Sequence, residues 1–112
     1  MSLASSKGIE VLSLSAATTG TGTSVNIPIS SNNPRINVRG VGTISGGTLI
    51  LEEASSPAYT GTWSQLLSIT ASALTGGAEQ VVHILGTLGA VRGRISSNIT
   101  GGGSVTVGVI SD

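Results

Sequence analysis

The charged side chains are the groups in this chain that could act in catalysis or binding, and there are few of them. Of 112 residues, five are Lys or Arg, five are Asp or Glu, and one is His. The adjacent carboxylates Glu52 and Glu53 could in principle serve as the acid and base of a glycosidase. However, neighbouring residues on a strand point to opposite faces, so the two cannot flank one glycosidic bond. We therefore expect a solvent-facing strand end at this position.

The single histidine, His83, is the second candidate for chemistry. One histidine cannot form a multi-histidine metal site, and no serine or aspartate lies in a motif that would make it a catalytic base. The chain has no cysteine, which excludes disulfides, thiolate catalysis and Cys-ligated metals. A hydrolase that used His83 or Glu52 would also need further catalytic groups beside it, and the sequence offers none that we can name. We expect His83 to be half-buried or at an interface, and we predict no enzyme activity, no cofactor and no metal site.

The arginines form two pairs at the spacing of a strand. Arg35 and Arg39 fall on one face if the segment alternates, and Arg92 and Arg94 share a face in a later segment. A guanidinium presents its donors in a planar fork that suits carboxylates, either within a chain or across an interface. Four of the five basic residues lie in these pairs, and the fifth is Lys7. We predict all five as partner contacts, and glutamates of the same chain remain alternative partners for the arginines.

The only aromatic residues, Tyr59 and Trp63, lie four residues apart in a segment rich in Thr and Gly. Two such rings could form the platform of a carbohydrate-binding module. A domain this poor in aromatic residues more often places them in its core or in an interface. We predict the latter role for both.

Composition excludes several further classes of function. The net charge is zero and only five residues are basic, so the chain lacks the positively charged surface that binds nucleic acid. Apolar runs reach about three residues, far from the roughly 18 that would span a membrane, and the N-terminal residues do not resemble a secretory signal. The glycine clusters match no phosphate-binding loop and are typical of turns. Only 9% of the residues are charged, which favours a surface covered by subunit contacts and therefore an assembling protein.

The hydrophobic pattern predicts an all-β chain. Apolar residues recur with period two, β-branched residues are abundant, and Gly-rich turns separate the runs. Pro28 has no backbone N–H to donate to a neighbouring strand, which indicates that its segment is an edge strand. The segment Ser64–Leu74 is interpreted as strand and loop without a helix. We predict an antiparallel β-sandwich, most simply a jelly roll, after a loose arm at residues 1–8, with residues 9–112 as one domain. The eight expected strands are Ile9–Ser15, Ser24–Ser30, Arg35–Val41, Thr48–Glu53, Trp63–Thr70, Glu79–Leu85, Ala90–Ser96 and Ser104–Ile110.

Three segments carry a resemblance to a known class of proteins. The stretch Thr48–Ser64 contains Glu-Glu-Ala followed by Tyr-Thr-Gly-Thr-Trp-Ser. Val91–Ser96 reads Val-Arg-Gly-Arg-Ile-Ser, and Thr100–Val107 reads Thr-Gly-Gly-Gly-Ser-Val-Thr-Val. Together these segments, over roughly residues 44–110, resemble small structural proteins of tailed bacteriophages.

The resemblance implies a non-enzymatic β-sandwich of the virion. Its size and composition are similar to those of capsid decoration (cement) proteins, which commonly form homotrimers that bind the major capsid protein of an assembled head. The implied location is the virion, assembled in the bacterial cytoplasm, with no nucleic-acid or membrane partner. Tail proteins share similar sandwiches, so a tail-associated carbohydrate-binding or host-adhesion module, using Tyr59 and Trp63, is the alternative.

Overall fold

The computed structural model describes residues 9–27, 33–84 and 89–111 and shows an all-β fold. The expected arm with Lys7, and Pro28, lie outside the described residues. The elements in chain order are β1 (Ile9–Ala17), β2 (Gly20–Thr21), β3 (Val25–Asn26), β4 (Arg35–Val41), β5 (Gly46–Ala54), β6 (Ser64–Thr70), the 3-10 helix η2 (Ala71–Gly77), β7 (Glu79–His83), β8 (Ala90–Thr100) and β9 (Ser104–Ser111).

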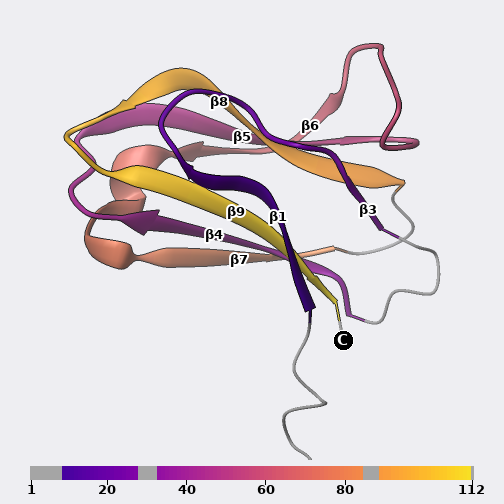
Figure 1. The fold of residues 1–112 in the computed structure, drawn as a ribbon, viewed down its shortest axis with the longest axis horizontal. Coiled ribbons are helices and arrows are strands. Elements are labelled where there is room, and N and C mark those ends of the chain that lie inside the picture. The colour runs from indigo at the N-terminus through magenta and orange to yellow at the C-terminus, as the bar shows by residue number, and fades with distance from the viewer. Residues whose placement is uncertain (1–8, 28–32, 85–88, 112) are drawn as a thin grey trace, which may run out of the picture.

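The strands form two antiparallel sheets packed face to face (Figure 1). Sheet A has the order β1-β9-β4-β7, and sheet B has the order β2-β8-β5-β6, with β3 also paired to β8. Short β2 and β3 therefore act as two pieces of one interrupted edge strand beside β8. The expected antiparallel sandwich is confirmed.

The connections between strands follow the jelly-roll pattern. Apart from the step from β2 to β3 and the hairpin β5–β6, each successive strand lies in the opposite sheet. Such crossing connections bring strands from the two ends of the chain together, as in the pairing of β1 with β9. The two sheets thus depend on residues far apart in the sequence.

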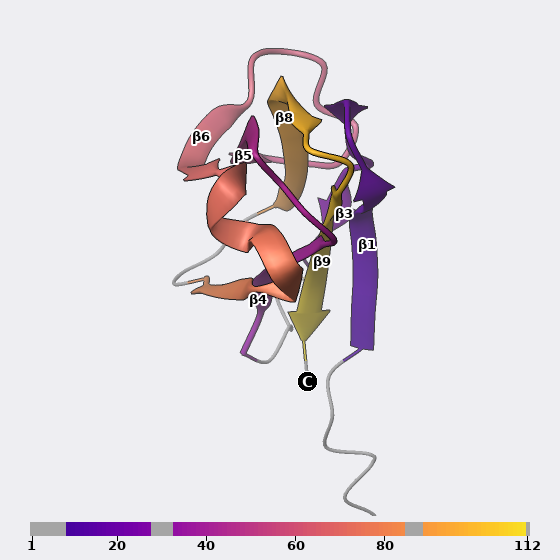
Figure 2. The same ribbon diagram turned by 90° about the vertical axis from the view of Figure 1, so that its left-hand side faces the viewer.

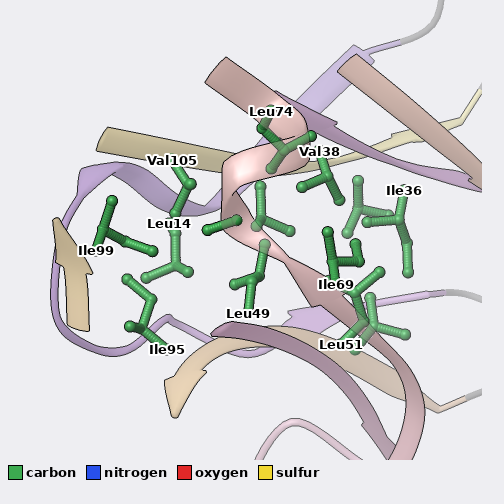
Figure 3. Close-up of a cluster of buried hydrophobic side chains, with 14 of the residues drawn as sticks. Leu14, Ile36, Val38, Leu49, Leu51, Ile69, Leu74, Ile95, Ile99 and Val105 are labelled. Carbon is green, nitrogen blue, oxygen red and sulfur yellow. The ribbon is translucent and has the colours of Figure 1, made fainter. Parts of the chain in front are cut away.

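The space between the sheets is filled by aliphatic side chains, because alternate residues of each strand point inward. Val38 and Val105 of sheet A face Leu49 and Leu51 of sheet B, and all four are inaccessible to solvent. Figure 3 shows this cluster, which neither Tyr59 nor Trp63 enters; its labelled members are Leu14, Ile36, Val38, Leu49, Leu51, Ile69, Leu74, Ile95, Ile99 and Val105.

The 3-10 helix η2 corrects the expectation of a plain loop after β6. It connects β6 of sheet B to β7 of sheet A and lies between the sheets along one side (Figure 2). Its residues Ala71 and Leu74 are buried, so it caps the core there. Gly76 and Gly77, with φ of +73° and +86°, then turn the chain into β7. The apolar period of this short segment, only one or two turns, was too brief to show in the sequence.

Most expected strands are present with shifted ends. The strand Arg35–Val41 has the expected bounds, whereas β8 runs on to Thr100, through residues expected to form a turn. Strand β2 lies in a Gly-Thr run that was also expected to be a turn. Of the expected strand Ser24–Ser30, the structure describes β3 alone.

Candidate functional site

The outer face of sheet B carries a cluster of three charged residues and one aromatic residue, which we call the Glu52 cluster: Glu52, Arg92, Arg94 and Trp63. Glu52 of β5 lies opposite Arg92 of β8 in the register of the sheet. Nε of Arg92 donates to Oε1 of Glu52 at 2.7 Å, and Nε of Arg94 to Oε2 at 3.3 Å. The Glu52 side chain is only 5% exposed, against 25% and 37% for the two arginines. One buried carboxylate thus holds two guanidinium groups side by side at the surface.

The indole of Trp63 lies beneath this cluster. The guanidinium carbon of Arg92 is 4.2 Å from the ring centroid, which is a cation–π contact. The ring nitrogen donates to the carbonyl oxygen of Tyr59 at 3.2 Å. Trp63 is 6% exposed and does not belong to the aliphatic cluster between the sheets, and its predicted role in an interface stays a prediction. Tyr59 is 44% exposed and belongs to the surface of the β5–β6 loop.

The outer face of sheet A carries a row of polar residues that crosses the sheet. Arg39 of β4 binds Glu10 of β1 through two bonds, Nη1–Oε2 at 2.7 Å and Nη2–Oε1 at 3.0 Å. Nη1 of Arg39 also donates to Oδ1 of Asn37 at 2.8 Å, and Nδ2 of Asn37 donates to Oε2 of Glu79 in β7 at 3.0 Å. The buried amide of Asn37 is therefore satisfied on both sides.

A glycine makes the row on sheet A possible. The Glu10 side chain crosses β9 at Gly108, where an added Cβ would lie 2.6 Å from Cγ of Glu10. The charge of Arg39 is stabilised by the same contact. The hydrogen bond that Arg39 donates to Glu10 raises the pKa of its guanidinium above the ordinary value. Partial burial lowers this pKa, whereas the negative charges of Glu10 and Glu79 raise it further. Arg39 accordingly stays charged throughout the pH range of the folded protein.

Gly108→Ala is expected to separate Glu10 from Arg39. The clash falls on a flexible side chain, so Glu10 moves aside, and the free energy of unfolding falls by about 0.5–1 kcal/mol, the value of a partly exposed ion pair. Urea unfolding followed by circular dichroism measures the loss.

The control for Gly108→Ala is the same substitution in a Glu10→Ala background. With the glutamate removed, alanine suits a strand better than glycine does, and the change should become neutral or stabilising. An equal loss in both backgrounds would show that the ion pair does not depend on Gly108.

The predicted site residues fall into separate groups. The register places Arg35 and Arg39 on the outer face of sheet A and Arg92 and Arg94 on that of sheet B, so the two pairs lie on opposite sides of the sandwich. Arg35 donates to the carbonyl oxygen of Asn33 at 3.0 Å. The glutamate partners of Arg39, Arg92 and Arg94 come from distant strands, and only the register of the sheets identifies them.

One expectation about an individual residue was wrong, and a second was wrong in part. Glu52 does not lie at a solvent-facing strand end, because the arginines of β8 bind its carboxylate and its side chain is buried. His83 is exposed rather than half-buried, since β7 forms an edge of sheet A, and its alternative place at an interface stays a prediction. Glu53 does point to the opposite face from Glu52, as expected, and lies opposite Val91 with a buried Oε2 that has no hydrogen-bond partner.

Neither a metal-binding cluster nor a membrane-spanning helix is found among the described residues. Within 9–27, 33–84 and 89–111, no three His, Asp or Glu side chains are grouped so that they could hold a metal ion. The same residues include no helix with the length and hydrophobicity needed to cross a membrane.

No protein-family model and no curated protein matches this chain.

Proposed function

We propose that this protein is a non-enzymatic structural component of a tailed-phage virion, a decoration protein that binds the assembled capsid and stabilises contacts between capsid subunits. In this proposal the protein self-assembles, as trimers if the resemblance of its sequence holds. A protein that binds only the assembled shell stabilises it by mass action, and several linked copies bind with greater avidity than one.

The observation that carries the proposal is the Glu52 cluster. Arg92 and Arg94 are held by one carboxylate, and each side chain is partly exposed. Pre-positioned arginines lose little side-chain entropy on binding, and arginine is enriched in protein interfaces. Two ordered guanidinium groups on the outer face of a sheet suit carboxylates on another protein.

The fold and the composition support the same proposal. Jelly rolls are frequent among capsid proteins and lectins, an analogy at the level of fold alone. The alternative sugar-binding module would use Tyr59 and Trp63 together as its platform. Tyr59 is exposed, but the Trp63 ring is 6% exposed and covered by Arg92, so we expect no change of its fluorescence with glycans. The burial of one of the two rings supports the structural role.

The test is co-sedimentation with undecorated capsids of the virus that encodes the protein. Arg94→Ala removes the more exposed of the two arginine side chains and leaves the ion pair of Glu52 with Arg92, so the fold should persist. We expect its affinity for capsids to fall about tenfold, as for an interface arginine.

The matched control is Arg39→Ala, which removes the same charge from the other sheet. The sequence predicted Arg39 as a partner contact, but its guanidinium is bound by Glu10 and Asn37, so we expect this variant to keep capsid binding. Absence of capsid binding by the unaltered protein would overturn the proposal. Equal binding by the unaltered protein and Arg94→Ala would overturn the role of the Glu52 cluster.

A further inference from the structure

Strand β7 is an open edge of sheet A. Its five residues, Glu79–His83, pair in continuous antiparallel register with β4, from Arg39↔Glu79 to Arg35↔His83. Within the part of the chain that the structure describes, no other strand pairs with β7. An edge strand leaves a row of backbone donors and acceptors that can pair with another chain.

The other sheet edges are interrupted in ways that hinder such pairing. The register of β1 with β9 shifts twice, and that of β6 with β5 shifts once, as at β-bulges. The remaining edge of sheet B is split into β2 and β3, of two residues each. Among the described strands, β7 alone presents an edge without a shift or break, and it has neither proline nor lysine to protect it.

The direction of the free backbone groups follows from the bonds at both ends of β7. The amide of Gly40 donates to the carbonyl of Ala78 at 3.1 Å, and that of Ile84 to the carbonyl of Pro34 at 3.1 Å. In an antiparallel pair, alternate residues exchange hydrogen bonds with the neighbouring strand. The even-numbered residues of β7 therefore bond to β4, and Glu79, Val81 and His83 direct their amides and carbonyls away from it.

The side chains of Glu79, Val81 and His83 could pair favourably with the same residues of a second copy of β7. An antiparallel pair of β7 strands centred on Val81 places Glu79 of each copy opposite His83 of the other. Val81, which is 43% exposed, then packs against its own counterpart. Arg35, beside His83 in β4, adds positive charge at the end that receives the glutamate.

We propose that two copies of this protein associate through β7, in antiparallel register about a two-fold axis at Val81, so that sheet A continues from one copy into the next. All three opposed pairs join residues whose backbone groups point outward, so each pair can form both of its hydrogen bonds. The inference is independent of the proposed function. The β7 contact alone gives a dimer. If each copy also belongs to a trimer, the same contact joins two trimers into an assembly of six copies.

The test is the mass of the full chain in solution, measured by sedimentation at protein concentrations up to about 1 mM, because a five-residue pairing is a small interface. We expect a twofold higher mass for the unaltered protein than for Val81→Lys, which places like charges at the two-fold axis. The control is Val41→Lys, in β4 on the same outer face and 55% exposed, which should leave the mass unchanged.

Charge reversal tests the register. His83→Glu should weaken association about tenfold, since it creates two Glu–Glu pairs across the axis, and adding Glu79→Lys should restore association through two Lys–Glu pairs. Equal masses for the unaltered protein and Val81→Lys would overturn the proposal, as would a double variant that associates no better than His83→Glu. Binding to capsids is a separate measurement, so failure of one proposal leaves the other standing.

Discussion

Replacing Gly40 with alanine is expected to lower the free energy of unfolding by about 3 kcal/mol, at the upper end of the cost of overpacking a core. Gly40 lies in β4 where η2 crosses sheet A, and an added Cβ would collide with the carbonyl oxygen of Leu74 and lie 2.9 Å from Cδ1 of Ile44. The obstacle is backbone, which cannot turn aside as a side chain does.

The surroundings of Gly40 also prevent η2 from retreating. The amide of Gly76 donates to the carbonyl of Gly42 at 2.9 Å, and the amide of Ile44 donates to Oγ1 of Thr75 at 2.9 Å. Leu74 itself is 2% exposed and fills the core beside these bonds. Moving η2 outward would therefore break hydrogen bonds and uncover an apolar side chain.

Chemical denaturation followed by circular dichroism measures the effect of Gly40→Ala, and Gly76→Ala is the matched control. At Gly76 a Cβ would meet nothing within 4 Å, and only the positive φ of +73° opposes it, which costs about 1 kcal/mol. Equal losses in the two variants would show that the close approach of η2 to β4 is unimportant.

Glu52→Ala is expected to have the second largest effect, a loss of about 2 kcal/mol. The substitution leaves Arg92 and Arg94 side by side without the carboxylate that neutralises them. Removing one member of a buried ion pair is costly, but both arginines are partly exposed and can turn toward water, which limits the loss. The emission of Trp63 should shift to the red as Arg92 leaves its ring.

The control for Glu52 is its neighbour. Glu53→Ala removes the same functional group from the opposite face, where Oε2 is buried without a hydrogen-bond partner, so we expect a loss of less than about 1 kcal/mol and unchanged emission. Comparable losses and comparable red shifts from both substitutions would refute the central role of Glu52.

The sequence predicted the class of fold because strands with one buried face repeat apolar residues with period two. Strand β4 shows this most clearly: Ile36 and Val38 face the core, and the arginines alternate with them. Segments without such a pattern were missed or shortened. Strand β2 has two residues, and η2 is one short helical segment, neither long enough to display a period.

The sequence did not predict the pairing of charges. The contact of Glu52 with Arg92 joins residues 40 positions apart, and that of Glu10 with Arg39 joins residues 29 apart. Which strands are neighbours, and in what register, depends on the whole jelly roll. One local signal was available: Gly108 lies between two core-facing valines of an alternating strand, and a glycine there indicates that another group approaches the backbone closely.

The order of the strands has a consequence for folding during synthesis on the ribosome. Strands β8 and β9 come last of the described strands, yet β8 lies between the β2–β3 edge and β5, and β9 lies between β1 and β4. Until residues 90–111 have been synthesised, each sheet lacks one of its two inner strands. Strand β4 can already pair with β7, and β5 with β6, but β1 must wait for a partner that is nearly 100 residues away. Pairings of such long range make folding slow. The nascent chain therefore carries β1, β2 and β3 unpaired for most of translation, when association with other chains competes with folding.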